Sequence, residues 1–270
     1  MKAFVMDLST CNGCYCCQIA CKDEHVANDW TPYAKPQPDS GQFWLRMLEK
    51  VRGTVPKVKV SYVPALCNHC DDAKCMEQCA AQAIYRRADG VVIIDPTKCT
   101  GCKLCPDACP SHSIYFNPDL NIAQKCTGCS HLIDDGWDVP RCVDACPTEA
   151  LRYGEESELQ ELIGKAELLD NGCGKGRVYY LNLPRKFVAG TVYDPVEKEV
   201  VIGATCTLKE AGGKTVQSVQ TDNFGDFWFH DLSDGQSYSL SIQKGAASKT
   251  IDGISTQEDV NLGDIAMRVV

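Results

Sequence analysis

The sequence has no long run of apolar residues and no excess of basic ones. No window approaches the roughly 18 consecutive apolar residues of a membrane-spanning helix. The start, MKAFVMDLSTCNGC, is too short in apolar residues for the core of a signal peptide and has no small-residue cleavage site. The formal net charge of −9 argues against a nucleic-acid-binding surface, which would be basic. We therefore expect a cytoplasmic chain with no membrane span, whose partner is a protein and not a nucleic acid.

The sequence also has no pattern that marks a catalytic site. It contains no phosphate-binding loop, no GxGxxG after a strand and no recognisable Ser–His–Asp set. We expect no catalytic residue and no substrate site on this chain alone.

Cysteine is the residue present in unusual number, with nineteen in 270 residues. Seventeen of them precede residue 147, which leaves Cys173 and Cys206 alone in the remainder. In a small secreted protein this count would indicate a disulfide framework, whereas in a reducing cytoplasm it indicates bound metal. The first part of the chain is therefore predicted to be a metal-binding domain.

The clustered cysteines form four groups with a shared pattern. Each group begins with C-x2-C and ends with C-x3-C, and only the middle gap varies. The groups are Cys11, Cys14, Cys17 and Cys21; Cys67, Cys70, Cys75 and Cys79; Cys99, Cys102, Cys105 and Cys109; and Cys126, Cys129, Cys142 and Cys146. Cys16 is left over as a spare thiol beside the first group. The repetition makes the signal stronger than any single motif.

This spacing favours iron–sulfur clusters of the 4Fe-4S type. A cubane cluster takes one soft thiolate at each iron corner, and a C-x2-C-x2-C loop supplies three. We expect the fourth cysteine to lie at the start of a short helix and to point toward another cluster, as in two-cluster ferredoxins. Gly13, Gly101 and Gly128 let backbone amides approach the cluster sulfides. Zinc, which usually joins two separated C-x2-C pairs, is the alternative.

Other residues beside the cysteine groups allow two interpretations. His69 and His131 adjoin predicted ligands and can tune a cluster, but they can equally be structural. Several cations also flank the groups and either offset cluster charge or are simply solvated: Lys22, Lys74, Lys98, Lys103, Lys125 and Arg141.

Composition divides the chain into three parts. Residues 1–150 form the cysteine-rich domain, residues 151–185 a helix-and-strand connector, and residues 186–270 a β-domain. In the connector, apolar residues recur at helical spacing over 156–169, which predicts a helix. In the β-domain, Tyr238, Leu240 and Ile242 alternate with polar residues, and Cys206 lies on the apolar face of another predicted strand. The predicted fold class is α+β: two pseudo-symmetric two-cluster ferredoxin-like modules, then a seven-stranded prealbumin-like β-sandwich.

Taken together, CNGCYCCQIACKDEH, LCNHCDDAKCMEQCAAQAIYRRADGVVIIDPTKCTGCKLCPDACP and KCTGCSHLIDDGWDVPRCVDACPTEAL resemble the four-cluster electron-transfer subunit of the dimethyl-sulfoxide-reductase family of molybdenum enzymes. The resemblance covers about residues 1–185. It implies a large catalytic partner subunit that holds molybdenum bis-pterin guanine dinucleotide. It also implies up to four 4Fe-4S clusters on this chain, or three if one site stays empty.

In that family the first cysteine group pairs with the fourth, and the second pairs with the third. The resemblance therefore implies four ligand sets: Cys11, Cys14, Cys17 and Cys146; Cys126, Cys129, Cys142 and Cys21; Cys99, Cys102, Cys105 and Cys79; and Cys67, Cys70, Cys75 and Cys109. Ala80 departs from the proline usual after the fourth cysteine, which puts the third set in some doubt.

The predicted β-sandwich is absent from most members of the family. It favours a molybdenum transhydroxylase, whose reaction has no net redox change. A conduit for a net reductase or dehydrogenase and a freestanding polyferredoxin remain as alternatives.

Overall fold

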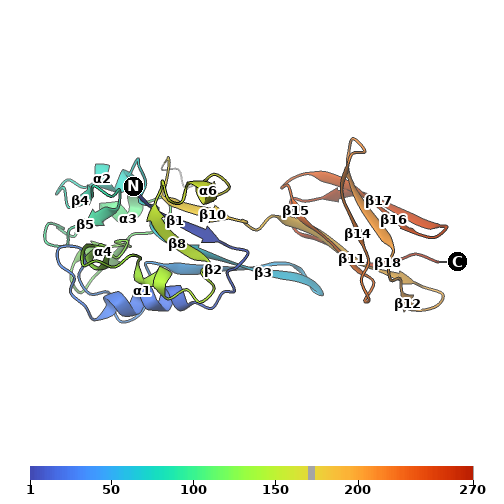
Figure 1. Ribbon diagram of the computed structural model, residues 1–270, viewed down its shortest axis with the longest axis horizontal. Helices are drawn as coiled ribbons and strands as arrows, with labels where there is room; N and C mark the ends of the chain where they lie inside the picture. Colours follow the sequence, from blue (N-terminus) through green and yellow to red (C-terminus); the bar gives the residue numbers. More distant parts are fainter. Residues whose placement is uncertain (170–173, 270) are drawn as a thin grey trace. The chain divides into compact units, whose positions relative to one another are not determined.

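The computed structural model describes residues 1–169 and 174–269 and divides the chain into two compact units (Figure 1). The first unit holds Met1–Glu49 and Tyr62–Leu183, and the second holds Lys50–Ser61 and Pro184–Val270. Within the described part of the chain, no helix is long and apolar enough to cross a membrane. Cys173, predicted to be an isolated thiol, lies outside the described residues.

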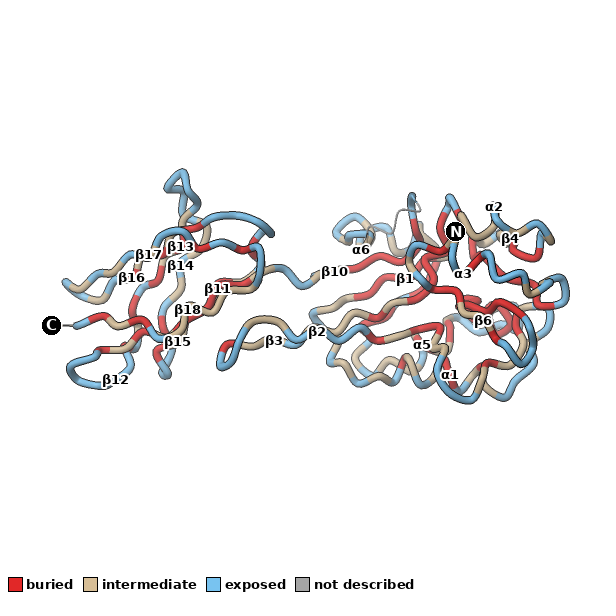
Figure 2. The backbone as a smooth tube through the Cα atoms, turned by 180° about the vertical axis from the view of Figure 1, so that it is seen from behind, coloured by how far each residue is buried: buried red, intermediate tan, exposed pale blue. Residues whose placement is uncertain are grey.

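A four-stranded sheet organises the first unit. Its order is β8 (Leu151–Glu155), β1 (Lys2–Asp7), β10 (Val178–Leu181) and β9 (Glu167–Leu168), with β1 parallel to β10 and antiparallel to β8. Both faces of β1 are buried, since Phe4 enters the larger core of the unit and Val5 a smaller one. Figure 2 shows the buried stretches along β1 and β10. The sheet thereby ties the connector to the cysteine-rich segment.

The cysteine groups lie on short helices and hairpins of the first unit. The helices are α1 (Cys16–Val26), α2 (Lys74–Glu77), α3 (Leu104–Ala108), α4 (Ser130–Asp134) and α5 (Arg141–Asp144). The hairpins are β4 (Ile84–Arg86) with β5 (Val92–Ile94) and β6 (Tyr115–Asn117) with β7 (Ile122–Gln124). Helix α1 packs on α5 and α2 packs on α3, so the first cysteine group meets the fourth and the second meets the third.

The predicted position of the fourth cysteine relative to its helix was wrong. The third cysteine of each group lies on the helix, as Cys75 lies on α2 and Cys105 on α3. The fourth cysteine follows the end of the helix in three groups, at Cys79, Cys109 and Cys146. In the first group the longer helix α1 contains both Cys17 and Cys21. A helix of four or five residues spans the three-residue gap, so its end and not its start presents the last thiol.

The predicted helix over 156–169 forms only in part. Helix α6 covers Gln160–Ile163, and β9 then pairs with β10 through Leu168 and Tyr179. Gly164 follows α6 directly and disfavours its continuation. Leu159 and Leu162 still pack against the buried face of β1, as their spacing suggested. Strand pairing therefore overrides the helical pattern at the end of this segment.

The second unit is a β-sandwich. One sheet has the order β12 (Glu199–Val200), β11 (Lys186–Asp194) and β15 (Asp226–Leu232). Strand β18 (Val260–Ala266) also pairs with β11, in parallel orientation. The other has the order β14 (Thr215–Gln220), β13 (Thr205–Glu210), β16 (Ser237–Lys244) and β17 (Ala247–Ser255). The described residues thus form eight strands in these two sheets, where seven were predicted. The shortest of the eight is β12, which has two residues.

Side chains from both sheets share one core. Val188, Phe229 and Leu240 are fully buried there, and so is Cys206, which confirms that it is a core residue. The alternation at Tyr238, Leu240 and Ile242 is also confirmed, since all three are buried. This unit is therefore stabilised by its own apolar core and not by metal ligands.

The tip of a long hairpin completes the second unit. The hairpin consists of β2 (Arg46–Thr54) and β3 (Lys57–Ala65), and residues 50–61 belong to the second unit. Lys57 forms an ion pair with Asp226 and lies over the Trp228 ring, 5.9 Å from its centroid. The side-chain amide of Asn261 donates a hydrogen bond of 3.0 Å to the Thr54 carbonyl. A segment from the cysteine-rich half thus contributes to the β-sandwich.

Candidate iron–sulfur centres

Three cavities in the first unit are each lined by four of the predicted cysteines. The three sets of lining thiols are Cys67, Cys70, Cys75 and Cys109; Cys79, Cys99, Cys102 and Cys105; and Cys21, Cys126, Cys129 and Cys142. Each cavity combines three thiols of one group with one of another. The helix pairs bring these separated segments together.

The remaining four predicted ligands gather near the start of α1. Burial, followed by the neighbouring charges of Cys146, Cys11 and Cys14, raises the pKa of Cys17 to about 12. Burial and the charges of Cys146 and Cys14 also raise the pKa of Cys11. Such mutual effects require the thiols to be close. In this group Cys14 is exposed and Cys11 is half-buried.

The thiols are suited to bind a positively charged group. Burial raises the pKa of Cys105 and Cys129 to about 12 and that of Cys126 to about 11. It also raises the pKa of Cys21 and Cys142 well above the usual value of 9.0. Unassisted, these thiols stay protonated at neutral pH, whereas bound iron stabilises the thiolates that coordinate it. The fold therefore brings sulfur donors together in sets, and a bound cationic centre would stabilise their thiolate form.

The arrangement of four thiols around each cavity fits a cluster of several atoms. A single zinc ion would require four sulfurs about 2.3 Å from one point. In the described residues, no three His, Cys, Asp or Glu side chains lie close enough to hold one ion. Four thiols around a cavity match a cubane, whose iron corners lie apart and each take one thiolate.

Left-handed backbone conformations close the C-x2-C loops. Gly13, Gly101 and Gly128 have φ values of 68°, 70° and 61°, and His69 has 46° at the corresponding position. A side chain at Gly101 would meet Asn121 at 2.5 Å, so glycine is required there. The Gly128 amide donates a hydrogen bond of 3.4 Å to the Cys126 sulfur. The Gly128 amide thus lies close to a cysteine sulfur, while the approach of the glycine amides to cluster sulfides stays a prediction.

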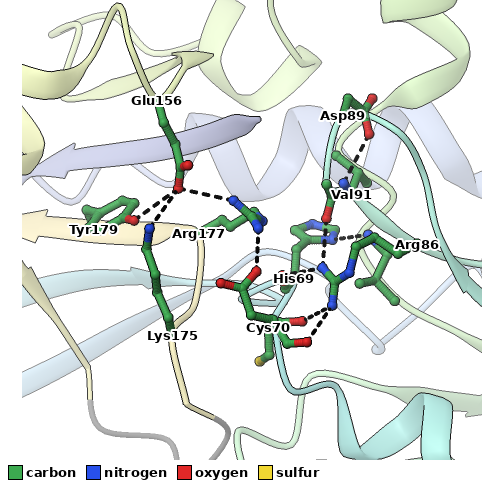
Figure 3. A network of polar contacts seen from close by, with 12 residues as sticks. His69, Cys70, Arg86, Asp89, Val91, Glu156, Lys175, Arg177 and Tyr179 are labelled. Carbon is green, nitrogen blue, oxygen red and sulfur yellow. Dashed lines mark hydrogen bonds and ion pairs between the residues drawn. The ribbon is translucent and has the colours of Figure 1, made fainter.

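A polar network holds the loop of the second cysteine group (Figure 3). The Arg86 guanidinium donates to the carbonyls of His69 and Cys70 and, at 2.9 Å, to that of Asp71. The Val92 amide donates a hydrogen bond of 3.1 Å to Nδ1 of His69, so that ring serves as a structural acceptor. Sequence reasoning missed Arg86, because its partners in this loop are backbone carbonyls more than ten residues away.

Arg177 extends this network toward the sheet. Its guanidinium is paired with Glu156 at 3.1 Å and also with Asp71. The Tyr179 hydroxyl donates to the same Glu156 carboxylate at 3.2 Å, as Figure 3 shows. Strand β10 is thereby linked to the second cysteine loop.

The cations that flank the cysteine groups differ in burial and in their partners. Lys125 is buried, and its ammonium donates to the carbonyls of Val92 and Cys126, the latter at 2.9 Å. Its charge acts to lower the pKa of Cys75 and Cys126, against the dominant effect of burial. Lys22 is also buried and donates to the carbonyls of Pro38 and Gly41. Lys125 is therefore placed to offset cluster charge.

The other flanking cations have partners at the surface. Lys74 pairs with Asp72 and Glu77, Lys98 with Asp95, and Arg141 with Asp144, while Lys103 lies over the Phe116 ring. These contacts fit the solvated interpretation.

The remaining candidates near the clusters have other contacts. Cys16 is exposed and shares a side-chain hydrogen bond with Cys14, as suits a spare thiol beside the first group. His131 contacts the Glu24 carboxylate through Nε2 at 3.0 Å and stacks on Trp30. The His131 contacts support a structural role.

Comparison with known proteins identifies both parts of the chain. The family described as 4Fe-4S dicluster domain matches residues 58–156, and the carboxypeptidase regulatory-like domain matches residues 188–268. The pyrogallol hydroxytransferase small subunit of Pelobacter acidigallici is 36% identical, covering 97% of this chain and 98% of that protein. The arsenate respiratory reductase iron-sulfur subunit ArrB of Shewanella sp. (strain ANA-3) is 32% identical, covering 70% of this chain and 98% of that protein. The thiosulfate reductase electron transfer subunit PhsB of Salmonella typhi is 36% identical over 60% of this chain and 81% of its own length.

Proposed function

This chain belongs to the iron–sulfur subunits of the dimethyl-sulfoxide-reductase family of molybdenum enzymes, and from that premise we propose that it serves a transhydroxylase acting on phenolic rings. Members of the family transfer electrons through 4Fe-4S clusters as subunits of larger enzymes. The catalytic molybdenum bis-pterin guanine dinucleotide would lie on a large partner subunit. In the proposed reaction, pyrogallol and a tetrahydroxybenzene cosubstrate give phloroglucinol.

We assign the cluster ligands by the pairing of the family. The four sets are Cys11, Cys14, Cys17 and Cys146; Cys126, Cys129, Cys142 and Cys21; Cys99, Cys102, Cys105 and Cys79; and Cys67, Cys70, Cys75 and Cys109. The three cysteine-lined cavities support the last three sets, since each cavity combines the same four thiols. The charge of Cys146, which acts to raise the pKa of both Cys11 and Cys17, supports the first set.

The residues of this chain would bind, shield and tune the clusters. Bound clusters supply one-electron transfer. Mostly buried thiols shield two of the sites from water, those that include Cys21 and Cys67, and backbone amides such as that of Gly128 donate to sulfur. The buried ammonium of Lys125 offsets negative charge between the second and fourth cysteine groups. A cytoplasmic location suits these thiols, because reducing conditions keep them available for iron.

The extent of similarity is the observation that carries the transhydroxylase proposal. The match to the pyrogallol hydroxytransferase small subunit covers 97% of this chain, including its C-terminal β-domain. By contrast, ArrB is matched over 98% of its length yet covers only 70% of this chain. The β-domain thus accompanies similarity to the hydroxytransferase subunit and not to the arsenate reductase subunit.

The test is an assay without any electron acceptor. Pyrogallol and the tetrahydroxybenzene cosubstrate are added to the natively purified complex, and phloroglucinol is measured. Because transhydroxylation has no net redox change, phloroglucinol should form at the same rate with or without an acceptor. Product formation only with an acceptor or donor present would instead indicate a net reductase or dehydrogenase.

A net molybdenum oxidoreductase is the second candidate. It is favoured by the similarity of the first unit to ArrB and PhsB, which serve arsenate and thiosulfate reductases. It predicts turnover that depends on a quinone or a soluble electron partner. A freestanding polyferredoxin is a further alternative, and copurification with molybdenum would exclude it.

A further inference from the structure

One of the cysteine-lined cavities also contains several buried polar atoms without partners. Trp44, His25 and Thr127 line the cavity of Cys21, Cys126, Cys129 and Cys142. Nε1 of Trp44, Nε2 of His25 and Oγ1 of Thr127 are buried and make no hydrogen bond. Within the described part of the chain, no residue lining the cavity of Cys79, Cys99, Cys102 and Cys105 has such an atom. A cluster in the first cavity would therefore lie beside buried polar atoms without partners, whereas a cluster in the second would not.

The indole of Trp44 is the clearest of these groups. Its N–H can only donate, and the side chain is 2% exposed, so water does not satisfy it. A buried donor without a partner costs about 1–3 kcal/mol, and nearly all buried donors in proteins are paired. The rest of the lining is largely apolar, with Phe4, Leu45 and Leu66. The sulfur atoms of a bound cluster are the acceptors that the cavity would provide.

The neighbouring histidine holds this indole against the cysteines. His25 lies one helical turn after Cys21 on α1, and its Nδ1 is 2.9 Å from the Cys21 carbonyl. A carbonyl only accepts, so Nδ1 carries the proton. The rings of His25 and Trp44 pack together with centroids 4.6 Å apart. Trp44 is thus fixed by a residue that is itself tied to a proposed ligand.

We infer that the Trp44 indole N–H donates a hydrogen bond to a sulfur of the cluster held by Cys21, Cys126, Cys129 and Cys142, and thereby raises the reduction potential of that cluster. The inference rests on the ligand assignment proposed above. A hydrogen bond to sulfur stabilises the more negative, reduced state more than the oxidised one. The cluster gains one electron from the reductant, while the N–H bond stays intact and no proton is transferred. Trp44 is a tuning residue and not a ligand.

The test is a redox titration of the natively purified, cluster-loaded protein, followed by electron paramagnetic resonance. Trp44→Phe removes the N–H and keeps most of the apolar volume. We expect the equilibrium constant for one-electron reduction of one cluster to fall about tenfold, which is a shift of about 59 mV to lower potential. The other midpoint potentials and the iron and sulfide contents should not change.

Trp30→Phe is the matched control. Trp30 belongs to the same aromatic group, since it stacks on His131 with centroids 4.3 Å apart. Its indole N–H already donates to the Glu24 carbonyl at 3.0 Å. Loss of that N–H should therefore leave all cluster potentials where they are.

The wild-type protein provides a second measurement that does not depend on a variant. With ¹⁵N in the indole rings, pulsed resonance of the reduced protein should detect one indole nitrogen coupled to a cluster, and Trp30→Phe should retain it. No coupling in wild type, or an unchanged potential in Trp44→Phe at unchanged iron content, would overturn the inference alone. Wild-type protein without iron and sulfide would overturn both this inference and the ligand assignment.

Discussion

Individual thiols in this protein differ mainly in how far the fold removes them from water. Cys21 and Cys142 are buried, and burial raises their pKa values well above 9.0, whereas Cys14 is exposed. Burial disfavours the thiolate form of the proposed ligands, so the energy of their deprotonation must come from a bound metal. The sites with buried thiols should be the ones best protected from oxidation and solvent.

Replacing one proposed ligand should remove the cluster it helps to hold. In Cys105→Ala we expect the loss of about a quarter of the iron, because the cavity shared with Cys79, Cys99 and Cys102 loses one corner. Since α2 packs on α3, the neighbouring site should also bind its iron less tightly. Iron and acid-labile sulfide per chain are the measurement.

Cys206→Ala is the control for this variant. Cys206 is fully buried in the core of the β-sandwich and contacts no other cysteine group within the described residues. Its loss should leave the iron content unchanged, while an unchanged iron content in Cys105→Ala would disprove the ligand set.

Arg86 should matter for how firmly the second cysteine loop holds its cluster. Arg86→Ala leaves the carbonyls of His69, Cys70 and Asp71 without their charged donor. A hydrogen bond to a charged group contributes about 1.5–3 kcal/mol, so loss of the equivalent of one such bond should let a chelator remove the cluster at least about tenfold faster. The decay of visible absorbance under anaerobic conditions measures this rate.

Arg152→Ala is the matched control, because Arg152 is exposed and pairs with Glu149 only at 3.9 Å. It should decay at the wild-type rate. Equal decay of the Arg86 and Arg152 variants would show that the polar network does not retain the cluster.

At the scale of elements, local patterns were predictable and distant contacts were not. Strand β16 follows from the alternation of Tyr238, Leu240 and Ile242, because one face is buried. The helix predicted over 156–169 forms only at Gln160–Ile163, and its later part instead pairs as β9 with β10, a partner strand ten residues away. The cysteine groups could be predicted from their spacing. The roles proposed for Arg86 and Trp44 could not, because they depend on contacts with residues distant in the sequence.

The hairpin tip is the largest feature that sequence patterns did not reveal. Residues 50–61 lie between two cysteine groups, yet they pack in the β-sandwich unit. The contacts are specific and many are polar, such as the ion pairs of Lys57 with Asp226 and of Arg52 with Asp259. Nothing in the local alternation of β2 and β3 distinguishes this tip from an ordinary solvent-exposed turn.

That ion pair should contribute to the stability of the second unit. Lys57 is 4% exposed, so Asp226→Ala leaves a buried ammonium without its carboxylate. We expect the free energy of unfolding of this unit to fall by roughly 3 kcal/mol, the lower end for breaking a buried pair. The measurement is the denaturant midpoint of the native protein, with unfolding monitored by far-ultraviolet circular dichroism at β-sheet wavelengths.

Lys57→Met provides the comparison, because methionine fills the same space without a charge. It should destabilise the unit much less than Asp226→Ala, since Asp226 keeps the hydrogen bond from the Thr191 hydroxyl at 2.6 Å. Equal losses in both variants would contradict the view that the buried lysine charge is the cause.

At the scale of the whole molecule, cluster binding and the β-domain belong to different units. All sixteen proposed ligands lie in the first unit, and the second is stabilised by an apolar core and the hairpin tip. The electron-transfer subunits of reductases share the first unit, and the hydroxytransferase subunit is similar over both. Similarity over the whole chain is therefore what supports the proposed transhydroxylase function, while similarity of the first unit places the chain in the wider family.

The most direct test is the elemental content of the natively purified protein. The account predicts iron and acid-labile sulfide in equal amounts, about sixteen of each per chain or about twelve if one site is empty, with molybdenum copurifying on a large subunit. Zinc in place of iron and sulfide would contradict it.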